Sequence, residues 1–388
     1  MGNGHSTPTC PTVDQSGPPI QHLVGNLTFH RLSVIISGAA AVWSCLIAVT
    51  LVFSHATHFS NPPEQKQFVN RQIIRIINII PFFALVTLLC VWQNGSQQPY
   101  IAPALDVGEA FPMAAAFLLM SAYLVPEEGN RESFFNQLEM IDKKGNSTGS
   151  GSWKWYKKLS LLVIQWIPVS ILLWIAAAAS LAAGTYCGTS NKPHFAHIWI
   201  TLLRMLSTVL CIAAILRFYK RSKSELKPRG SLKQLICFKL IVALNFLQTF
   251  IFNFLESGGH LQANKYLSFN DLSHGIPSLM LSCEIAIIAP FFFIAYSPKR
   301  YIIRNPSDEA RRHQGYAGGP FGFYAILSAI NIVDIVTTLL QAIKGRAEGG
   351  GFNIAIHNDF RGYSEAPDYG QDIPVDRQGG RKDRRQRY

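Results

Sequence analysis

Residues Arg31 to Phe53 read RLSVIISGAAAVWSCLIAVTLVF, a run with no charged side chain after its first position. A hydrocarbon core of about 30 Å needs roughly 20 apolar residues in a helix, which pairs its own backbone polar groups there. We therefore expect this stretch to be a membrane-spanning helix. Six more stretches of the same kind follow it: Ile73–Trp92, Ala102–Val125, Leu159–Ala183, Phe195–Phe218, Gln234–Leu255 and Ile276–Tyr296. Together they predict an all-α, polytopic membrane protein whose residues 31–296 form a seven-transmembrane-helix bundle.

Lys and Arg concentrate in alternate loops between these stretches. The loops after the first, third, fifth and seventh stretches carry most of them, among others Lys66, Arg131, Lys157, Arg229 and Arg300. The loops of the opposite side contain only Lys192 and Lys265. Because Lys and Arg resist translocation, we expect residues 1–30 to form an outer or lumenal tail and the C-terminus to be cytosolic.

The composition agrees with a bundle in lipid. Hydrophobic residues make up 48% of the 388-residue chain and charged residues only 15%, which is too apolar for an ordinary soluble domain. The net charge is +12, but 14 of the 35 Lys and Arg follow Ser297. The charge therefore reflects basic cytosolic segments more than an acidic substrate.

The seven cysteines show no zinc or redox spacing. Five lie inside apolar stretches, where they behave as small hydrophobic residues: Cys45, Cys90, Cys211, Cys237 and Cys283. Cys10 and Cys187 fall on the same predicted outer side and could pair, but nothing in the sequence brings them together. Unpaired cysteines are the favoured interpretation.

The chain continues beyond the last span as a predicted cytosolic tail. A basic collar at 297–320 precedes an apolar segment at 321–345, in which Ser328, Asn331, Asp334, Thr338 and Gln341 recur at three- and four-residue steps. This spacing predicts an amphipathic helix lying on the membrane surface or against the bundle, with an eighth span as the alternative. Residues 346–388 are Gly-rich and polar, which indicates a disordered basic tail.

Ionisable side chains inside the apolar stretches are the candidate site residues, because each costs about 2.5 to 3.5 kcal/mol at the bilayer centre. Asp106 and Glu109 are three residues apart, which places both carboxylates on one helix face. With Arg204 and Glu284 they fall in the outer half of the membrane. We expect these four either to line a polar substrate vestibule or to form a neutralised packing cluster, and both interpretations stay open.

Three more polar residues form a secondary set. Arg75 lies near the end of the second span, and Lys239 lies a turn or two inside the cytosolic edge, where its long stem can extend to the interface. Gln248, with Asn245 and Asn253, is expected to hydrogen-bond between helices. Prolines at positions 81, 112, 168 and 290 each free a backbone carbonyl and permit a bend in their span.

Residues that would support enzyme chemistry are dispersed. The histidines are divided between the predicted outer side (His194, His197, His260, His274) and the opposite side (His55, His58). None of these sets has a defensible metal-ligand spacing, and phosphate loops and nucleophile elbows are absent from the sequence. We therefore expect neither an enzyme nor a bound cofactor or metal.

Five short motifs resemble the organic solute transporter subunit alpha family and its fungal and plant relatives. They are RQIIRI (71–76), DVGEAF (106–111), AAILRFY (213–219), CFK (237–239) followed by Gln248, and SCE (282–284). The resemblance covers about Arg31 to Pro298 and implies a seven-helix protein with an outer N-terminus. It also implies movement of amphipathic solutes such as bile acids and steroids by facilitated diffusion, with a small partner subunit, and a vacuolar or endosomal membrane for the fungal and plant members.

The favoured function is transport of an amphipathic, steroid- or organic-anion-like solute by facilitated diffusion, since the chain has no nucleotide-binding segment. A vacuolar or endosomal membrane is favoured over the plasma membrane, and the expected partners are lipid, the solute and a small subunit or a second copy, but no nucleic acid. The alternative is a receptor-like scaffold that recruits a cytosolic adaptor at Tyr324–Leu327.

Overall fold

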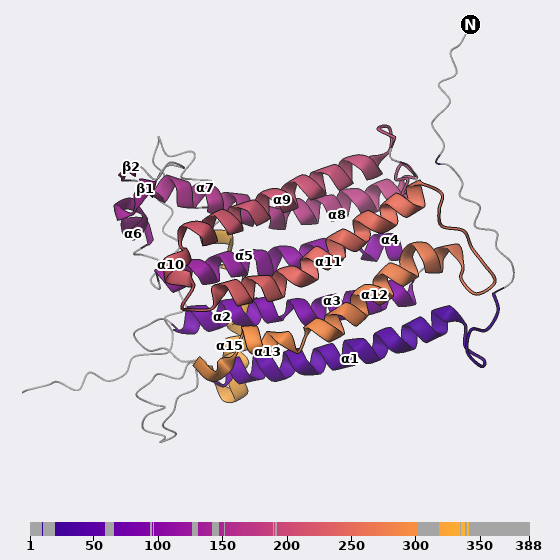
Figure 1. Cartoon of the computed structure of the whole chain (residues 1–388), viewed down its shortest axis with the longest axis horizontal. Coiled ribbons are helices and arrows are strands. Elements are labelled where there is room, and N and C mark those ends of the chain that lie inside the picture. The colour runs from indigo at the N-terminus through magenta and orange to yellow at the C-terminus, as the bar shows by residue number, and fades with distance from the viewer. Residues whose placement is uncertain are drawn as a thin grey trace, which may run out of the picture. The chain divides into compact units, whose positions relative to one another are not determined.

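Apolar helices dominate the residues that the computed structural model describes, which are 10, 20–58, 66–93, 95, 97–125, 131–141, 147–150, 152–188, 190, 192–300, 318–333, 335–337 and 340. Seven rods lie side by side (Figure 1). Three are single helices, α1 (Phe29–Ala56), α9 (Ala196–Arg221) and α11 (Ser231–Ser257). Four consist of two helices in line: α2 (Lys66–Ile77) with α3 (Ile79–Trp92), α4 (Gln98–Ile101) with α5 (Ala104–Leu124), α7 (Ser152–Ile164) with α8 (Trp166–Ala182), and α12 (Ile276–Ile288) with α13 (Phe291–Ala295). The predicted all-α bundle is confirmed.

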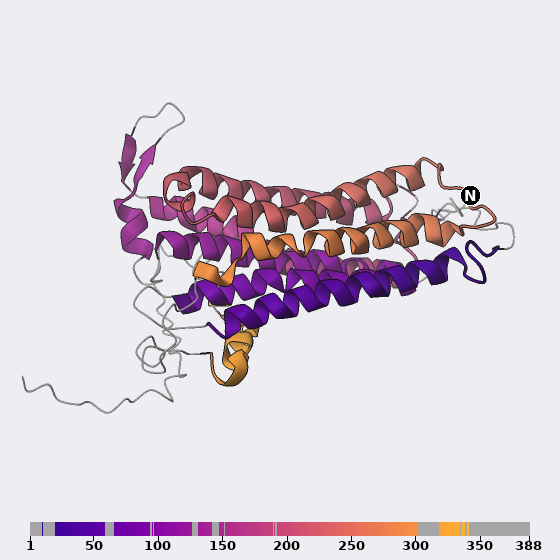
Figure 2. The ribbon, with the colours of Figure 1, turned by 60° about the horizontal axis from the view of Figure 1, so that its bottom comes forward.

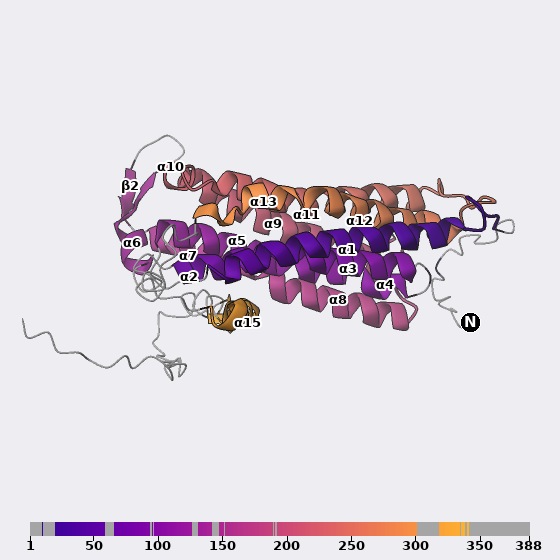
Figure 3. The ribbon, with the colours of Figure 1, turned by 90° about the horizontal axis from the view of Figure 1, so that it is seen from below.

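Seven helical runs among the described residues are long and apolar enough to cross a membrane. Six of them coincide with rods of the bundle, and the other is Pro320–Thr337. The rod α12–α13 is not among them, because the break before Phe291 divides it into helices of 13 and 5 residues. It nevertheless packs along α1 and α3 (Figure 3) and completes the bundle.

The centre of the bundle is α5. Met113, Phe117 and Leu118 of this helix have no exposed surface, whereas Leu202 and Leu206 of α9 are more than half exposed. Large apolar side chains that face outward suit hydrocarbon, in which only a backbone with satisfied hydrogen bonds is tolerated.

Three of the four prolines coincide with breaks between paired helices. The α2–α3 and α7–α8 breaks fall at Asn78 and Gln165, three residues before a proline, and the α12–α13 break falls at Pro290 itself. Pro290 has no N–H for the carbonyl of Ala286, and the indole Nε1 of Trp43 on α1 donates to that carbonyl at 3.2 Å. A neighbouring helix thus supplies the hydrogen bond that the proline removes.

Shorter elements connect the rods. A hairpin of β1 (Glu139–Ile141) and β2 (Ser147–Ser150) follows α6 (Arg131–Gln137) and projects from one end of the bundle (Figure 2). The helix α10 (Lys223–Leu226) joins α9 to α11. A π-helical turn, η2 (Asp271–Gly275), leads into α12, and a 3-10 turn, η3 (Pro298–Arg300), follows α13.

The C-terminal helix α15 (Phe323–Ile330) follows a 3-10 turn, η4 (Pro320–Gly322), and lies crosswise to the rods (Figures 1 and 3). Ala325 and Ala329 are buried in one cluster with Ala56 of α1 and Ile74 of α2. The helix therefore packs against the bundle, which is one of the two placements that its amphipathic pattern predicts. Residues 334, 338 and 341 of the expected polar stripe lie outside the described ranges.

Arg75 of α2 joins the C-terminal end of α15 to the bundle. Its Nε donates to the carbonyl of Ala329 at 2.8 Å, its Nη2 donates to the carbonyl of Asn331, and its Nη1 donates to Gln72 Oε1 at 3.0 Å. The side chain is buried. Carbonyls in the last turn of a helix lack an intrahelical donor, and a cation beside them is favourable.

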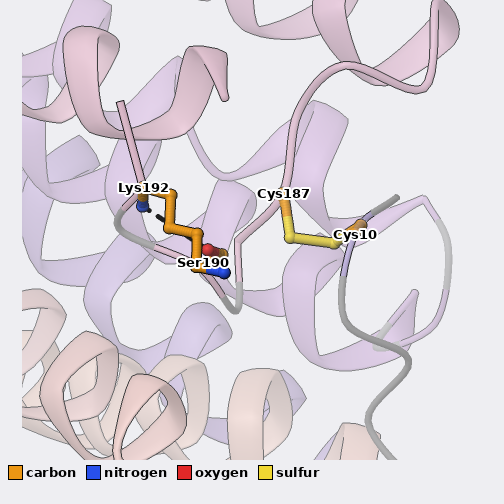
Figure 4. Close-up of a disulfide and its surroundings, with 4 residues drawn as sticks. All are labelled: Cys10, Cys187, Ser190 and Lys192. Carbon is orange, nitrogen blue, oxygen red and sulfur yellow. Dashed lines mark hydrogen bonds between the residues drawn. A yellow bond between two sulfur atoms is a disulfide. The ribbon is translucent and has the colours of Figure 1, made fainter. Parts of the chain in front are cut away.

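A disulfide joins Cys10 to Cys187, with the two Cα atoms 5.6 Å apart (Figure 4). The expectation that these cysteines stay unpaired is therefore wrong. They are separated by 177 residues, and only the packing of the rods brings the loop after α8 next to the N-terminal segment. The bond lies at the end of the bundle that the loop charges place outside.

Candidate functional site

A cavity of about 640 Å³ lies at the predicted outer end of the bundle. Its walls come from α3, α4, α5, α8, α9, α11, α12 and the turn η2, and Cys10 and Tyr186 contribute from the segments outside the rods. The polar residues that line it include Gln98, Asp106, His197, Thr201, Arg204, Asn245, Gln248, Thr249, Asn253, Glu256, Asn270, Ser273, His274 and Ser278. Apolar side chains such as Leu105, Leu181, Phe252 and Leu281 line the rest. The cavity is therefore amphipathic.

One face of α11 supplies most of the polar wall. Asn245, Gln248, Thr249, Asn253 and Glu256 recur at steps of three and four residues, and all five line the cavity. The role of the three amides between helices stays a prediction: all three line the cavity, and Gln248 also interacts with Glu284 of α12. The repeated spacing was visible in the sequence, but it does not say whether the polar face meets protein or a cavity.

Asp106 and Arg204 form an ion pair between α5 and α9. Arg204 Nε lies 2.8 Å from Asp106 Oδ2, and both side chains are mostly buried, with exposures of 22% and 13%. Both residues also line a smaller cavity of about 50 Å³ that adjoins the large one between α9 and α11. The pair therefore lies at the inner boundary of the large cavity.

Glu109 lies one turn deeper on the same face of α5. It lines the smaller cavity, is 4% exposed and accepts a hydrogen bond from Trp166 Nε1 at 3.3 Å. Trp166 is completely buried at the start of α8. The structure thus brings three of the four predicted vestibule residues together around the Asp106–Arg204 pair.

Glu284, the fourth predicted residue, does not line either cavity. It lies on α12 beside Gln248, which itself faces the large cavity. The predicted depth of a residue in the membrane does not determine the direction in which its side chain points. Arg75 of α2 also lies away from the cavity, where it contacts α15.

Lys239 of α11 is deeper in the bundle than the large cavity. Its Nζ is buried and has no hydrogen-bond partner among the described residues, and its charge interacts with that of Glu109. The side chain therefore does not extend to the cytosolic interface as expected. The Lys239 side chain points into the bundle because the carboxylate of Glu109 lies near it there.

The outer edge of the cavity is held by covalent and aromatic contacts. Cys10, whose partner is Cys187, lines the cavity, and Tyr186 packs edge-on against His197 with ring centroids 5.2 Å apart. Burial raises the pKa of the Tyr186 hydroxyl, which keeps it a neutral hydrogen-bond donor. The disulfide and the ring contact thus hold the outer edge of the cavity in position.

Residues 33–301 match the organic solute transporter Ostalpha family, and this range is more than half of the chain. The chain belongs to the Ostalpha family. A transmembrane protein 184 homolog of Dictyostelium discoideum is 25% identical to it over 295 residues, which are 72% of this chain and 55% of the relative. The chain thus spans about half the length of that curated relative. No solved structure matches the chain.

The arrangement suits reversible binding of an organic solute. This member of the Ostalpha family is a multi-pass membrane protein of a transporter-type family, and its cavity offers amide, hydroxyl and charged groups opposite apolar ones. Within the described ranges, no group of three His, Cys, Asp or Glu side chains could hold a metal ion. A cavity of this kind can hold an organic solute through its shape, hydrogen bonds and charge.

Proposed function

We propose that this protein carries amphipathic organic solutes across its membrane by facilitated diffusion, with the outer cavity as the binding site. The observation that supports this most directly is the amphipathic cavity of about 640 Å³ inside the bundle of an Ostalpha-family chain. Ligand cavities for drug-sized molecules usually measure about 300 to 1,000 Å³. A steroid-sized body has room in it.

The two kinds of wall give the solute an orientation. Its apolar body lies against Leu105, Phe252 and Leu281, while its polar groups meet the α11 face. Such division of apolar and polar contacts is usual in small-molecule sites, where a few polar groups determine orientation and specificity.

The opposite end of the bundle is held by buried polar contacts. The hydroxyl of Tyr296 donates to the carbonyl of Gln234 at 2.9 Å, and Gln234 Nε2 donates to Tyr123 OH at 3.1 Å. All three side chains are buried. In the proposed cycle these contacts break when the solute leaves on the cytosolic side, because the cavity of the present structure lies at the outer end.

The loop charges support an outer or lumenal N-terminus and a cytosolic C-terminus. With this orientation, the cavity of the proposed carrier faces the exterior or the lumen. We place the protein in a vacuolar or endosomal membrane, in keeping with the resemblance described above, and expect a small subunit or a second copy as its partner.

Uptake by proteoliposomes tests the proposal. The full-length protein is reconstituted, and entry of a radiolabelled steroid is compared with that in protein-free vesicles. Thr249→Trp places a large ring in the cavity and is expected to abolish the protein-dependent uptake. Leu247→Trp is the matched control, because Leu247 is on the same helix but faces outward with 52% exposure.

The control variant is expected to retain uptake. Equal uptake by Thr249→Trp and Leu247→Trp would show that solute does not pass through this cavity. Uptake no greater than that of empty vesicles, by folded wild-type protein with a range of steroid and other amphipathic solutes, would contradict transport itself.

A further inference from the structure

We infer that residues 318–337 form a re-entrant membrane segment: the chain enters the cytosolic leaflet, covers the side of α5 between α2 and the rod α7–α8, and returns to the cytosolic side. This inference goes beyond the proposed transport function and does not depend on it. The segment has two partners, because its inner side chains pack on the bundle and its outer ones face the acyl chains of the lipid.

Ile335 is the residue of this segment that packs against α5. It is 3% exposed and lies in one cluster with Leu118 of α5 and Ile164 of α7. Leu118 is six residues before the end of α5 at Leu124, which is about 9 Å at 1.5 Å per residue. Ile164 is likewise six residues beyond Lys158, the last charged residue of α7. Both rods therefore place Ile335 inside the cytosolic half of the hydrocarbon core rather than at its surface.

The same cluster shows which part of the bundle the segment covers. Phe68 of α2 and Ile167 of α8 also pack against it, so Ile335 lies where these two rods flank α5. Ala114 and Leu118 of α5 have no exposed surface. The side chain of Ile335 thus separates this face of the central helix from lipid.

The chain bends between α15 and the turn that contains Ile335, and the backbone groups at the bend are hydrogen-bonded. α15 ends at Asn331, whose backbone is extended and whose carbonyl accepts from the buried guanidinium of Arg75. Asn331 Oδ1 accepts from the N–H of Val333 at 3.0 Å, and the carbonyl of Ile332 accepts from the N–H of Ile335 at 3.0 Å. Non-helical backbone at membrane depth is tolerated only where such partners are supplied. A buried cation in a span needs acceptors for the same reason.

Gly322 fixes the place where the segment meets the bundle. A Cβ at this position would lie 2.5 Å from the Cβ of Ala56, the last residue of α1, and the φ of Gly322 is +79°. Glycine combines this φ with such a close approach, whereas a larger residue would have to shift the segment. The start of α15 is therefore held at the cytosolic end of α1.

The outer face of α15 is apolar. Its side chains Phe323, Tyr324, Leu327 and Ile330 are each more than half exposed. Phe53, near the cytosolic end of α1, is 48% exposed, so the apolar outer surface of the bundle continues onto α15. An apolar helix face at the level of the cytosolic leaflet fits acyl chains.

Basic residues on both sides of the segment argue against a crossing. Residues 298–317 contain five Lys or Arg, and residues 338–388 contain nine. Because Lys and Arg resist translocation, both flanks are expected on the cytosolic side. An eighth span would require the nine basic residues of the tail to cross the membrane.

Photo-labelling from the lipid tests both faces of the segment. The full-length protein is placed in nanodiscs of phosphatidylcholine that carries a diazirine in one acyl chain, and labelled peptides are identified by mass spectrometry. We expect label on residues 323–330 and on the peptide with Leu202 of α9, which is 53% exposed, but none on residues 114–118.

Gly322→Ala tests whether the segment is the cover of α5. The added methyl group meets Ala56, so the segment should be displaced and the label on residues 114–118 should rise severalfold. Gly25→Ala is the matched control, because Gly25 also has a positive φ of +55° but nothing lies within 4 Å of the added Cβ. This control is expected to give the labelling pattern of wild type.

A pair of introduced cysteines gives a second measurement that does not depend on Gly322. Ile335→Cys combined with Leu118→Cys is expected to yield a disulfide-linked peptide after mild oxidation. Ile335→Cys combined with Leu119→Cys is the control and should yield none, because Leu119 belongs to the main core cluster on another face of α5.

Each contrary result overturns a defined part of the inference. Label on residues 114–118 of wild type equal to that at Leu202, or equal labelling in Gly322→Ala and Gly25→Ala, would overturn the cover. Unlabelled residues 323–330 would overturn the lipid contact, and a C-terminal tag on the predicted outer side would show an eighth span. A linked peptide in neither cysteine pair, or equally in both, would overturn the position of Ile335. None of these measurements involves solute, so their failure is distinct from failure of the proposed transport.

Discussion

Replacing Arg75 by Ala is expected to release α15 from the bundle. The guanidinium donates to the carbonyls of Ala329 and Asn331, and both bonds are lost in the variant. Hydrogen bonds to charged groups contribute about 1.5 to 3 kcal/mol each, so the two together contribute about 3 to 6 kcal/mol to docking. The remaining contact of α15 is apolar: Ala325 and Ala329 are buried at this surface, and Ile326 packs beside them.

Amide hydrogen exchange of the protein in lipid nanodiscs measures how stably α15 docks on the bundle. A loss of about 3 to 6 kcal/mol corresponds to an increase in the opening equilibrium of roughly 10² to 10⁴. Contact of lipid with the exposed apolar face of α15, which includes Tyr324 and Leu327, offsets part of the lost free energy of docking. We therefore expect exchange of the α15 amides to increase at least tenfold, while that of the α5 amides stays constant.

Arg217→Ala is the matched control, since Arg217 is exposed on α9 and its removal leaves the Arg75 contacts intact. Unchanged α15 exchange in Arg75→Ala would show that the buried guanidinium does not hold this helix. Equal acceleration in both variants would point to a general loss of stability instead.

Three more predictions concern the disulfide, the buried carboxylate and the orientation. Cys187→Ser is expected to lower the Tm, because it removes the disulfide to Cys10. A reducing agent should lower the Tm of wild type but not of this variant. If the reducing agent leaves the Tm of wild type unchanged, the disulfide does not stabilise the protein. Trp166→Phe removes the donor to Glu109 and should cost about 1 to 3 kcal/mol in the free energy of unfolding, and no measurable loss would mean that this contact is not made in the membrane. In sealed vesicles whose predicted outer or lumenal face points outward, an impermeant thiol reagent should modify Lys265→Cys directly but Lys227→Cys only after permeabilisation, and the opposite result would reverse the topology.

The seven spans were predictable because hydrophobic length is a property of consecutive residues. The last span shows the limit of this argument, since the run Ile276–Tyr296 was identified as continuous and the structure divides it before Phe291. A proline indicates that a break is possible, but the packing around it decides whether the helix divides. Pro112 lies inside an unbroken α5.

The site was predictable only in part, for a geometric reason. Asp106 and Arg204 are brought together because a carboxylate and a guanidinium attract each other, and Glu109 lies one turn from Asp106 on the same face of α5. Glu284 occupies a similar depth but points toward Gln248. Rotation of a helix about its axis depends on contacts with all its neighbours, which one sequence does not specify.

The disulfide and the polar face of α11 were missed for related reasons. Cys10 and Cys187 are distant in the chain, and their proximity depends on the arrangement of the rods. The α11 face has a regular spacing, but amides that cross-link helices and amides that line a cavity have the same spacing. Only the position of the cavity distinguishes the two roles.

The indole of Trp43 has a consequence for the proposed transport cycle. Because it donates to the carbonyl that Pro290 leaves without a donor, it joins the bend of α12–α13 to α1 in a medium that offers no replacement donor. Movement of α12 away from α1 would leave that oxygen without a donor in hydrocarbon. In the proposed cycle this hydrogen bond therefore favours movement of α1 and α12 together.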